Sequence, residues 1–481
     1  MLTYNMQERG QRPLYEHLYR CIRADIEQGR IAPDERLPSK RALARNLGVS
    51  VITVEGAYTQ LIAEGYLRTE QRKGYYACTL PQQTPTRTQT AYMPQPELPL
   101  KRTGSNEPED STHCIADLTG QAIAQGLFPY SVWAKNLRSI LAEESEWSLI
   151  GESSTQGSLR LRTALSNHLR GTRGMEVSPE QIVVGAGAQY LYGMVVQLLG
   201  HANVVALEDP GYPRLSSIYA ANGVATVPVA LDKEGISAAG LDASPATLAH
   251  IMPSHQFPTG IVTSIARRYE LLGWAARSPE RFIIEDDYDC ELRLAGKPVP
   301  SLQSIDTQGR VIYINTFAKT LGPAFRIGYL VLPSALAERY NRELGFYSCT
   351  VSAIDQLALA RFIESGEYER HLNRMRSHYR SVRDKLVTAL KGSALGPRIQ
   401  FKSLDSGIHF VLSIESDTSE EQLASSACGA GVLLRPLCSF SSQPANLMSQ
   451  ACKRLVVSYA GLDPKAIPSA IAALENAWRH A

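Results

Sequence analysis

Hydrophobic residues divide the chain into three regions with different periodicity. In residues 11–80 they recur every three to four positions, which is typical of short amphipathic helices. Beyond residue 113, short apolar runs alternate with helical stretches. Between the two, residues 81–113 show no hydrophobic period, and prolines alternate there with Thr, Gln and Asn. The pattern predicts a helical domain at 11–80, a flexible Pro/Thr-rich linker at 81–113 and a large α/β domain at 114–481.

The first region has the pattern of a small helical module closed by a hairpin. Its first helix carries an apolar residue at every fourth position: Leu14, Leu18, Ile22 and Ile26. A second, short helix follows Ser39 and stops at Gly48, and a third helix follows Ser50. The residues after it predict a hairpin with Arg72, Lys73 and Gly74 near its tip. This arrangement predicts a winged helix-turn-helix.

Polar and basic residues cluster at the starts of the second and third helices and at the hairpin. The positive excess of the module is small, so we expect a basic stripe rather than a basic coat. Hydroxyl groups at the start of the third helix can reach base edges or phosphates, and the cations suit the DNA backbone. A three-helix interaction domain with no nucleic-acid role is the alternative. The candidate DNA-binding residues are Arg36, Ser39, Lys40, Arg41, Ser50, Thr53, Arg72, Lys73 and Gly74.

The third region predicts a mostly parallel sheet covered by helices on both faces. In such sheets ligands bind beyond the carboxyl ends of the strands. The sequence G-A-G-A-Q at 185–189 follows one expected strand and precedes a helix, so Gly187, Ala188 and Gln189 could offer backbone N–H groups to a phosphate. The expected strands are Ile182 to Val184, Val204 to Leu207, Leu248 to Met252, Phe282 to Ile284, Val311 to Ile314 and Gly328 to Leu332.

Two strand ends carry residues that suit a phosphorylated pyridine with an aldehyde group. Lys319 follows one strand, where burial lowers the pKa of an amine and makes it a nucleophile, and Thr316 and Arg326 flank it as phosphate ligands. Asp286 and Tyr288 follow another strand and supply a carboxylate for a ring nitrogen and a phenol for a ring oxygen. A solvated lysine, a metal site and a helix cap are the alternatives for these motifs taken singly.

Together these motifs resemble the fold type I pyridoxal-phosphate enzymes, which have the aspartate aminotransferase architecture. The resemblance is strongest to the MocR-type regulators, a branch of the GntR transcription factors that includes the GabR and PdxR regulators. It is carried by L-P-S-K-R at 37–41 and by P-S-H-Q-F-P-T-G at 253–260. The family implies pyridoxal 5′-phosphate as cofactor, with Lys319 as the Schiff-base lysine and Tyr212 stacked on the ring. It also implies Asp286 at the pyridine nitrogen, Tyr288 at the ring hydroxyl and Arg326 at the phosphate.

The chain departs from the family pattern at several positions. Phe257 stands where aminotransferases usually carry an asparagine, so Tyr288 alone, or Tyr288 with His255 or Gln256, would hold the ring oxygen. Val456 stands where amino-acid-binding members have the arginine that clamps the substrate carboxylate. The resemblance to GabR-like regulators suggests Arg214 as a substitute that binds an effector. Two further departures are Ala188, where relatives often have a threonine, and Val51, where many have an arginine.

Composition limits the classes of protein that fit. The 481 residues, 44% of them hydrophobic, are sufficient for more than one domain, and a net charge of +2 excludes a globally basic nucleic-acid coat. The eight cysteines show no metal-ligand spacing and are interpreted as reduced core thiols. No signal-like or membrane-spanning apolar run is present. We therefore expect a cytoplasmic protein that does not enter membranes.

Three functions are compared. The first is a transcription regulator that binds pyridoxal phosphate through Lys319 and senses either that cofactor or an amino compound such as GABA. The second is an active aminotransferase with an appended helical domain, which Val456 disfavours because the carboxylate clamp is missing. The third, a cofactor-free interaction protein, leaves Asp286, Tyr288, Lys319 and Arg326 without a shared role. The resemblance also implies a homodimer, for which paired half-sites on double-stranded DNA are expected.

Overall fold

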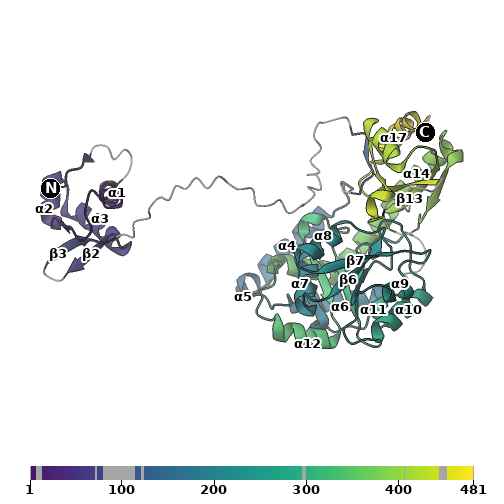
Figure 1. Cartoon of the computed structure of the whole chain (residues 1–481), viewed down its shortest axis with the longest axis horizontal. Helices are drawn as coiled ribbons and strands as arrows, with labels where there is room; N and C mark the ends of the chain where they lie inside the picture. The colour runs from purple at the N-terminus through teal and green to yellow at the C-terminus, as the bar shows by residue number, and fades with distance from the viewer. Residues whose placement is uncertain are drawn as a thin grey trace. The chain divides into compact units, whose positions relative to one another are not determined.

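The computed structural model describes residues 2–6, 13–70, 73–79, 114–120, 124–294, 300–405, 407–443 and 452–479. The chain forms two compact units, Met1–Glu107 and Pro108–Ala481 (Figure 1). The expected linker at 81–113 and the candidate DNA-binding residue Arg72 lie outside the described residues.

The first unit contains helices and a small sheet, as the periodicity predicted. Ser39 and Ser50 each accept a backbone N–H of the helix that follows, and Gly48 ends the second helix with a φ of 65°. Leu18 and Leu61 are completely buried between the first and third helices. The sheet has the order β1-β3-β2 and is antiparallel. The elements are α1 (Leu14–Glu27), β1 (Arg36–Leu37), α2 (Lys40–Leu47), α3 (Val51–Ala63), β2 (Leu67–Glu70) and β3 (Gly74–Ala77).

The second unit is built around a sheet of seven strands in the order β5-β11-β10-β9-β8-β6-β7. All neighbours are parallel except β11, which is antiparallel to both β10 and β5. The six expected strands are confirmed, and β7 was not expected from the sequence. The strands are β5 (Ile182–Gly185), β6 (Val204–Asp209), β7 (Ala225–Ala230), β8 (Leu248–Ile251), β9 (Phe282–Asp286), β10 (Val311–Thr316) and β11 (Gly328–Val331).

Helices cover both faces of this sheet because its strands are apolar on both sides. Ile312 and Ile314 pack with α7, α8 and α12, whereas Tyr313, on the opposite face, packs with α4, α6 and α13. Helices α9 and α10 cover Val311 and Ile283. The helices are α4 (Tyr130–Glu143), α5 (Glu146–Ile150), α6 (Leu159–Arg173), α7 (Ala188–Leu199), α8 (Arg214–Ala221), α9 (Ala238–Asp242), α10 (Ile265–Ala276), α11 (Leu302–Ile305), α12 (Ser334–Glu343) and α13 (Ala353–Glu364).

The C-terminal part of the second unit has its own antiparallel sheet, in the order β12-β13-β16-β15. Helix α14, with 26 residues, packs together with α17 over a core that includes Phe410 and Leu455 (Figure 1). The elements are β4 (Ala116–Asp117), α14 (Glu367–Gly392), β12 (Ile399–Lys402), β13 (His409–Glu415), α15 (Glu420–Gly429), β14 (Val432–Leu433), β15 (Arg435–Pro436), β16 (Cys452–Ser458) and α17 (Ile467–Ala477).

Two further expectations can be compared with the structure. All eight cysteines are free thiols, but Cys114 and Cys428 are exposed, so the interpretation of the cysteines as core residues is wrong for these two. Cys114 lies just before β4, and Cys428 lies in the last turn of α15. Among the described residues, no helix combines the length and the apolar composition that crossing a membrane requires.

Candidate functional site

Asp286 ends β9 and is held by a chain of buried hydrogen bonds. Its Oδ2 accepts from the hydroxyl of Tyr192 at 2.5 Å and lies 3.3 Å from Nε2 of His250, whose Nδ1 lies 2.7 Å from the hydroxyl of Tyr219. Its other oxygen, Oδ1, is buried and has no hydrogen-bond partner among the described residues. A buried carboxylate oxygen of this kind needs a donor. The N–H of a protonated pyridine would be such a donor.

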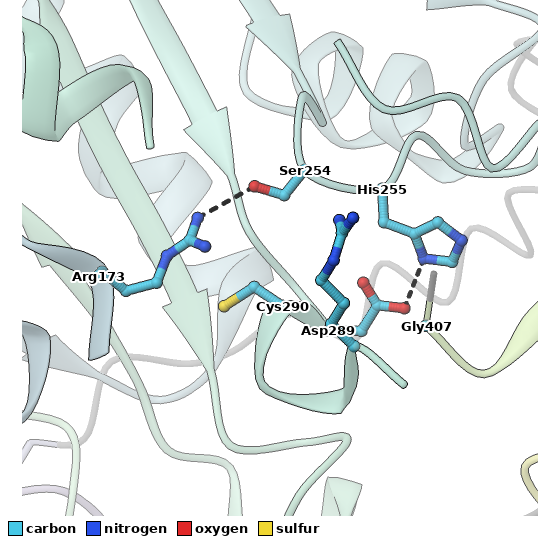
Figure 2. A pocket seen from close by; sticks show the side chains of 7 residues that line it. Arg173, Ser254, His255, Asp289, Cys290 and Gly407 are labelled. Carbon is cyan, nitrogen blue, oxygen red and sulfur yellow. Dashed lines mark hydrogen bonds and ion pairs between the residues drawn. The ribbon is translucent and has the colours of Figure 1, made fainter. Parts of the chain in front are cut away.

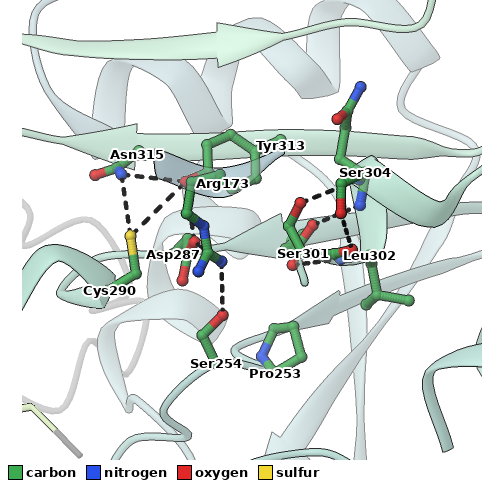
Figure 3. Close-up of polar contacts among 12 residues, drawn as sticks. Arg173, Pro253, Ser254, Asp287, Cys290, Ser301, Leu302, Ser304, Tyr313 and Asn315 are labelled. Carbon is green, nitrogen blue, oxygen red and sulfur yellow. Dashed lines mark hydrogen bonds and ion pairs between the residues drawn. The ribbon is translucent and has the colours of Figure 1, made fainter. Parts of the chain in front are cut away.

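The neighbouring carboxylates have structural roles. Asp287 accepts from Arg173 at 2.5 Å and from the hydroxyl of Tyr313 at 2.9 Å, and all of these groups are buried (Figure 3). Glu285 accepts the backbone N–H groups of Leu302 and Gln303 at the start of α11. Of the three adjacent acidic residues at 285–287, Asp286 is therefore the one with a buried oxygen left for a ligand.

A cradle for a phosphate lies where β5 leads into α7. Gly187 has a φ of 81° and begins α7, and the N–H groups of Ala188 and Gln189 have no acceptor among the described residues. The guanidinium of Arg326 lies over this turn and donates to the carbonyl of Ala186 at 3.0 Å. A Cβ on Gly187 would lie 2.9 Å from Arg326 Nη2, so glycine leaves the space above the turn open. Unpaired N–H groups at a helix start beside a guanidinium suit a phosphate.

Lys319 lies in the turn that follows β10, where Thr316 ends the strand. Burial lowers the pKa of the Lys319 amine, and the carboxylate of Asp289 partly offsets this effect. The amine forms no hydrogen bond or ion pair with the described residues, and the hydroxyl of Thr316 has no partner among them either. A partly desolvated lysine without a partner is suited to attack on an aldehyde.

Tyr288 belongs to a buried cluster with His255, Asp289 and His409. Nδ1 of His255 lies 2.8 Å from Asp289 Oδ2 (Figure 2). The same nitrogen lies 3.3 Å from the Tyr288 hydroxyl. Burial and the Asp289 carboxylate raise the pKa of Tyr288, whereas burial and the neighbouring His255 and Lys319 lower the pKa of His409 well below its ordinary value. Gly407 lies directly against His255, since a Cβ there would come within 2.2 Å of the ring.

This cluster could share protons or hold a cation. The ligand atoms of His255, Asp289 and His409 lie within 4.8 Å of one another. However, His255 and Asp289 are already hydrogen-bonded to each other, and the amine of Lys319 is close enough to affect His409. His255 Nδ1, one of the atoms that a metal ion would need, is therefore already in contact with Asp289 and with the Tyr288 hydroxyl.

Apolar and aromatic side chains surround Phe257 and Val456, the residues that stand where the family pattern led us to expect an asparagine and an arginine. We call this surface the apolar wall. The amide of Gln256 is occupied by protein partners: it accepts from Thr259 and donates to the carbonyls of Pro210 and Phe257. The Phe257 ring lies 6.0 Å from Tyr212, 6.4 Å from Tyr288 and 5.2 Å from His409.

Val456 belongs to a small apolar cluster against which Phe257 packs. Its side chain is buried and packs with Leu437 and Phe440. The side chain at position 456, where the family resemblance led us to expect a carboxylate clamp, thus lies in an apolar environment.

Three arginines near this wall differ in their surroundings. Arg214, at the start of α8, is exposed and has no polar partner among the described residues. Arg435 pairs with Val456 across β15 and β16, so both side chains lie on one face of the sheet, and its guanidinium lies 5.9 Å from the ring centroid of Phe440. Arg454 Nη2 is buried without a hydrogen bond, although Nε lies 3.9 Å from Glu420.

Some of these side chains could not be identified from the sequence. Tyr192, His250 and Tyr219 contact Asp286 directly or through one another, but they lie on α7, β8 and α8 and belong to no short motif. His409 and Arg435 come from strands of the C-terminal sheet that the periodicity did not reveal. Their residue types gave no signal, because only the fold brings them near Tyr288 and Val456.

The candidate DNA-binding residues of the first unit fall into two groups. Ser39 and Ser50 cap α2 and α3, and the Ser50 hydroxyl also lies 2.9 Å from that of Thr53. Lys40 is paired with Glu55, and Lys73 lies 3.3 Å from Glu70.

The remaining cations of this unit have fewer partners. Arg36 and Arg41 are exposed and have no ion pair among the described residues, and the Arg36 side chain lies beside Gly74 in the hairpin. These arginines, and Arg45 in the last turn of α2, are therefore the cations most available for phosphates.

Comparisons with known proteins agree with both units. The family of bacterial regulatory proteins of the gntR type matches residues 14–76, and aminotransferase class I and II matches residues 123–474. The probable rhizopine catabolism regulatory protein MocR of Rhizobium meliloti is 34% identical over 97% of this chain and 94% of that protein. The pyridoxine biosynthesis transcriptional regulator PdxR of Corynebacterium glutamicum is 32% identical, with 81% of each chain covered. A multiple substrate aminotransferase from Thermococcus profundus superposes with a TM-score of 0.66 at 21% identity, covering 77% of this chain and 94% of that one.

The geometry of the second unit fits the cofactor of the aminotransferase family. Among the described residues, Asp286 Oδ1 has no donor and the half-buried amine of Lys319 has no hydrogen bond or ion pair, and Gly187 leaves the phosphate cradle open. Pyridoxal 5′-phosphate is the cofactor on which this family depends. Both families match this chain, and its similarity to the relatives MocR and PdxR extends over most of both chains. The chain belongs to the MocR-type transcription regulators of the GntR family, in which a helix-turn-helix DNA-binding domain precedes an aminotransferase-like domain.

Proposed function

We propose that this regulator binds pyridoxal 5′-phosphate at the ends of β9 and β10 and that ligand exchange at this site changes its binding to DNA. The observation that carries the proposal is that the Lys319 amine and the Asp286 oxygen, both without a partner among the described residues, and the Gly187 cradle lie at the carboxyl ends of β10, β9 and β5, at one edge of the same sheet. When bound, the cofactor supplies an aldehyde that bonds reversibly to amines.

Each candidate side chain would have a separate task in holding the cofactor. Arg326, Thr316 and the N–H groups of Ala188 and Gln189 would hold the phosphate. Asp286, supported by Tyr192 and His250, would keep a proton on the ring nitrogen. Tyr288 would donate to the ring oxygen, with His255 and Asp289 fixing the phenol. Tyr212 would cover one face of the ring, and Lys319 would hold the aldehyde carbon.

Sensing rather than turnover is favoured by the wall around Val456. An amino-acid substrate needs a cation for its carboxylate, and the side chain at 456 is buried among apolar residues. We infer that pyridoxal phosphate itself is the effector, as the name of the relative PdxR suggests for pyridoxine biosynthesis. A GABA-like amino acid is the second candidate, with Arg214 as its anchor and Arg435 as the nearest cation to Val456 across the sheet.

These two effectors can be separated by titration. GABA and other amino compounds are added to the cofactor-loaded protein while its visible absorbance and its DNA affinity are followed. If pyridoxal phosphate is the effector, removing the cofactor changes DNA affinity and GABA does not. A change with GABA that Arg214→Ala abolishes would reverse the ranking. Arg435→Ala is compared with it: a loss of the GABA response in this variant instead of in Arg214→Ala would assign the carboxylate to Arg435.

We also propose that the chain acts as a homodimer. Large apolar side chains of the second unit are exposed, among them Trp147 at 80% and Phe346 at 75%. Such exposure is expected where a partner surface packs. Phe346 lies four residues before Thr350 in the chain. The Thr350 hydroxyl accepts the N–H of Ala186, which is next to the phosphate cradle. A second subunit packed against Phe346 would therefore lie close to the cofactor site. Sedimentation velocity of the full chain tests this, and a monomer at micromolar concentration would contradict it.

The DNA-binding region of each subunit would read one half-site, which requires paired half-sites in the operator. Residues 81–113 would be the linker between the domain at 11–80 and the domain at 114–481, and the protein would act in the cytoplasm. The direct test is a gel shift with the DNA upstream of the chain's own gene, with and without pyridoxal phosphate. If the protein retards the DNA to the same extent with and without pyridoxal phosphate, control of DNA binding by the cofactor is contradicted.

A further inference from the structure

Helix α3, the second helix of the helix-turn-helix, presents apolar side chains at its first turn. Val51 is 42% exposed and Ile52 is 79% exposed, whereas the residues that fix the helix to its unit, such as Val54 and Leu61, are fully buried. Exposed β-branched residues at a helix start do not improve helix stability. Their presence outside the core therefore indicates contact with a partner.

Polar groups of α3 are less available than its sequence suggests. The Ser50 hydroxyl accepts the Thr53 N–H at 3.1 Å and also lies 2.9 Å from the Thr53 hydroxyl, so one of the two hydroxyl donors is used within this turn. Glu55, one turn further along the exposed face, is paired with Lys40. Residues 51–63 contain no lysine or arginine. The start of the helix thus has little to offer to the hydrogen-bonding edge of a guanine.

Cations lie on neighbouring elements instead. Arg41 and Arg45 are on α2 and Arg36 is on β1; all are exposed and have no ion pair among the described residues. Phosphate contacts from these arginines would set the position of α3 without specifying sequence. Val51 and Ile52, which precede the buried part of the helix, would then be the residues that contact the base edges.

We propose that Val51 and Ile52 read the C5-methyl groups of thymine in the major groove, so that the half-site contains thymine at the bases they face. The thymine methyl is the one apolar group that the four bases display in that groove. The helix-turn-helix places the N-terminal residues of its second helix against base edges, which is where these two side chains are found. This proposal goes beyond DNA binding as such, because it names the chemical group that is recognised.

The test replaces single thymines by deoxyuridine in a short duplex cut from the DNA upstream of the chain's own gene. Uracil pairs as thymine does and lacks only the methyl group. Burial of one methyl group is worth about 0.8 kcal/mol, which corresponds to about a fourfold change in affinity. For the full-length protein we expect about three- to fivefold weaker binding at one or two positions of each half-site, measured by fluorescence anisotropy.

Substitution of the protein should remove this discrimination. Ile52→Ala, and Ile52→Ala combined with Val51→Ala, should bind the thymine and uracil duplexes equally at those positions. Ile265→Ala is the matched control, because Ile265 is also an exposed isoleucine at the first turn of a serine-capped helix but lies on α10 in the second unit. Since Ile52 is mostly exposed, its removal should leave the melting temperature unchanged.

The outcomes separate the proposal from the DNA-binding function itself. Equal binding of wild type to every uracil-substituted duplex would overturn it, and so would discrimination that persists in the Val51 and Ile52 double variant. A failure of the protein to bind its upstream DNA more tightly than a scrambled duplex would instead refute specific DNA binding by this region, and the proposal with it.

Discussion

The hydrogen bond from Tyr192 to Asp286 should determine how tightly the cofactor is held. The Tyr192 hydroxyl donates at 2.5 Å to Asp286 Oδ2 in a fully buried position, and His250 lies 3.3 Å from the same oxygen. Tyr192→Phe removes the shorter of these two bonds and leaves the ring, which packs edge-on against His250 at 5.0 Å. The ionised carboxylate is then less stabilised, and its hold on a protonated pyridine weakens.

A hydrogen bond to a charged group contributes about 1.5–3 kcal/mol. Because His250 still contacts the same oxygen, the lower end of this range applies, and about 1.4 kcal/mol corresponds to a factor of ten in a dissociation constant. We therefore expect Tyr192→Phe to raise the Kd for pyridoxal phosphate about tenfold. The assay is an absorbance titration of the cofactor-free protein at constant pH.

Tyr219→Phe provides the matched control for this variant. The Tyr219 hydroxyl contacts Nδ1 of His250 at 2.7 Å and reaches Asp286 only through that ring, so its loss should raise the Kd by a smaller factor. Thermal melting of the cofactor-free variants reports any general loss of packing. A Kd for Tyr192→Phe within twofold of wild type, or equal losses in the two variants, would refute the role assigned to this contact.

The remaining predictions concern pH and DNA. Burial lowers the pKa of Lys319, and the Asp289 carboxylate partly offsets this effect. The rate of cofactor binding should therefore rise with pH through a midpoint below the ordinary 10.5, and Asp289→Asn should move that midpoint lower still. An unchanged midpoint in the variant would contradict this prediction. Burial raises the pKa of Glu208 to about 8, so the folded state holds a proton that the unfolded state releases near pH 4.5, and stability falls as pH rises between these values. Between pH 5 and pH 8, the free energy of unfolding of Glu208→Gln should therefore rise by about 2–4 kcal/mol relative to that of wild type. A difference in melting temperature that does not depend on pH would show that Glu208 is not the cause. Arg41→Ala should weaken DNA binding to all sequences and lower the slope of log affinity against log salt by about 1. Lys73→Ala should have a smaller effect, because Lys73 is 3.3 Å from Glu70; equal slopes in the two variants would argue against this distinction.

Sequence periodicity was sufficient for the elements whose apolar pattern is local. The stripe from Leu14 to Ile26 and the apolar run from Val311 to Ile314 each appear in the structure as expected. Strand β7 was missed because it lies at the sheet edge, where Val229 is its only buried residue and Pro228 interrupts the apolar run. An edge strand has no need for the continuous hydrophobic run by which a central parallel strand is recognised.

The candidate site was predictable only where its residues lie at strand ends. Asp286 ends β9, Lys319 follows β10, and Arg326 precedes β11, whose antiparallel direction places its start at the same edge of the sheet. His250 and His409 belong to different sheets, and their proximity to Asp286 and Tyr288 depends on how those sheets pack. Which of three adjacent carboxylates is free for a ligand also depends on packing, since Arg173 and α11 occupy the other two.

The central claim is that a ligand bonded to Lys319 controls DNA binding by the same chain. The most direct measurement is the affinity for the upstream DNA, determined by fluorescence anisotropy for wild type and Lys319→Ala, each with and without pyridoxal phosphate. We predict that the cofactor changes the Kd of wild type and leaves that of Lys319→Ala unchanged. An equal change in both proteins, or no change in either, would contradict the account.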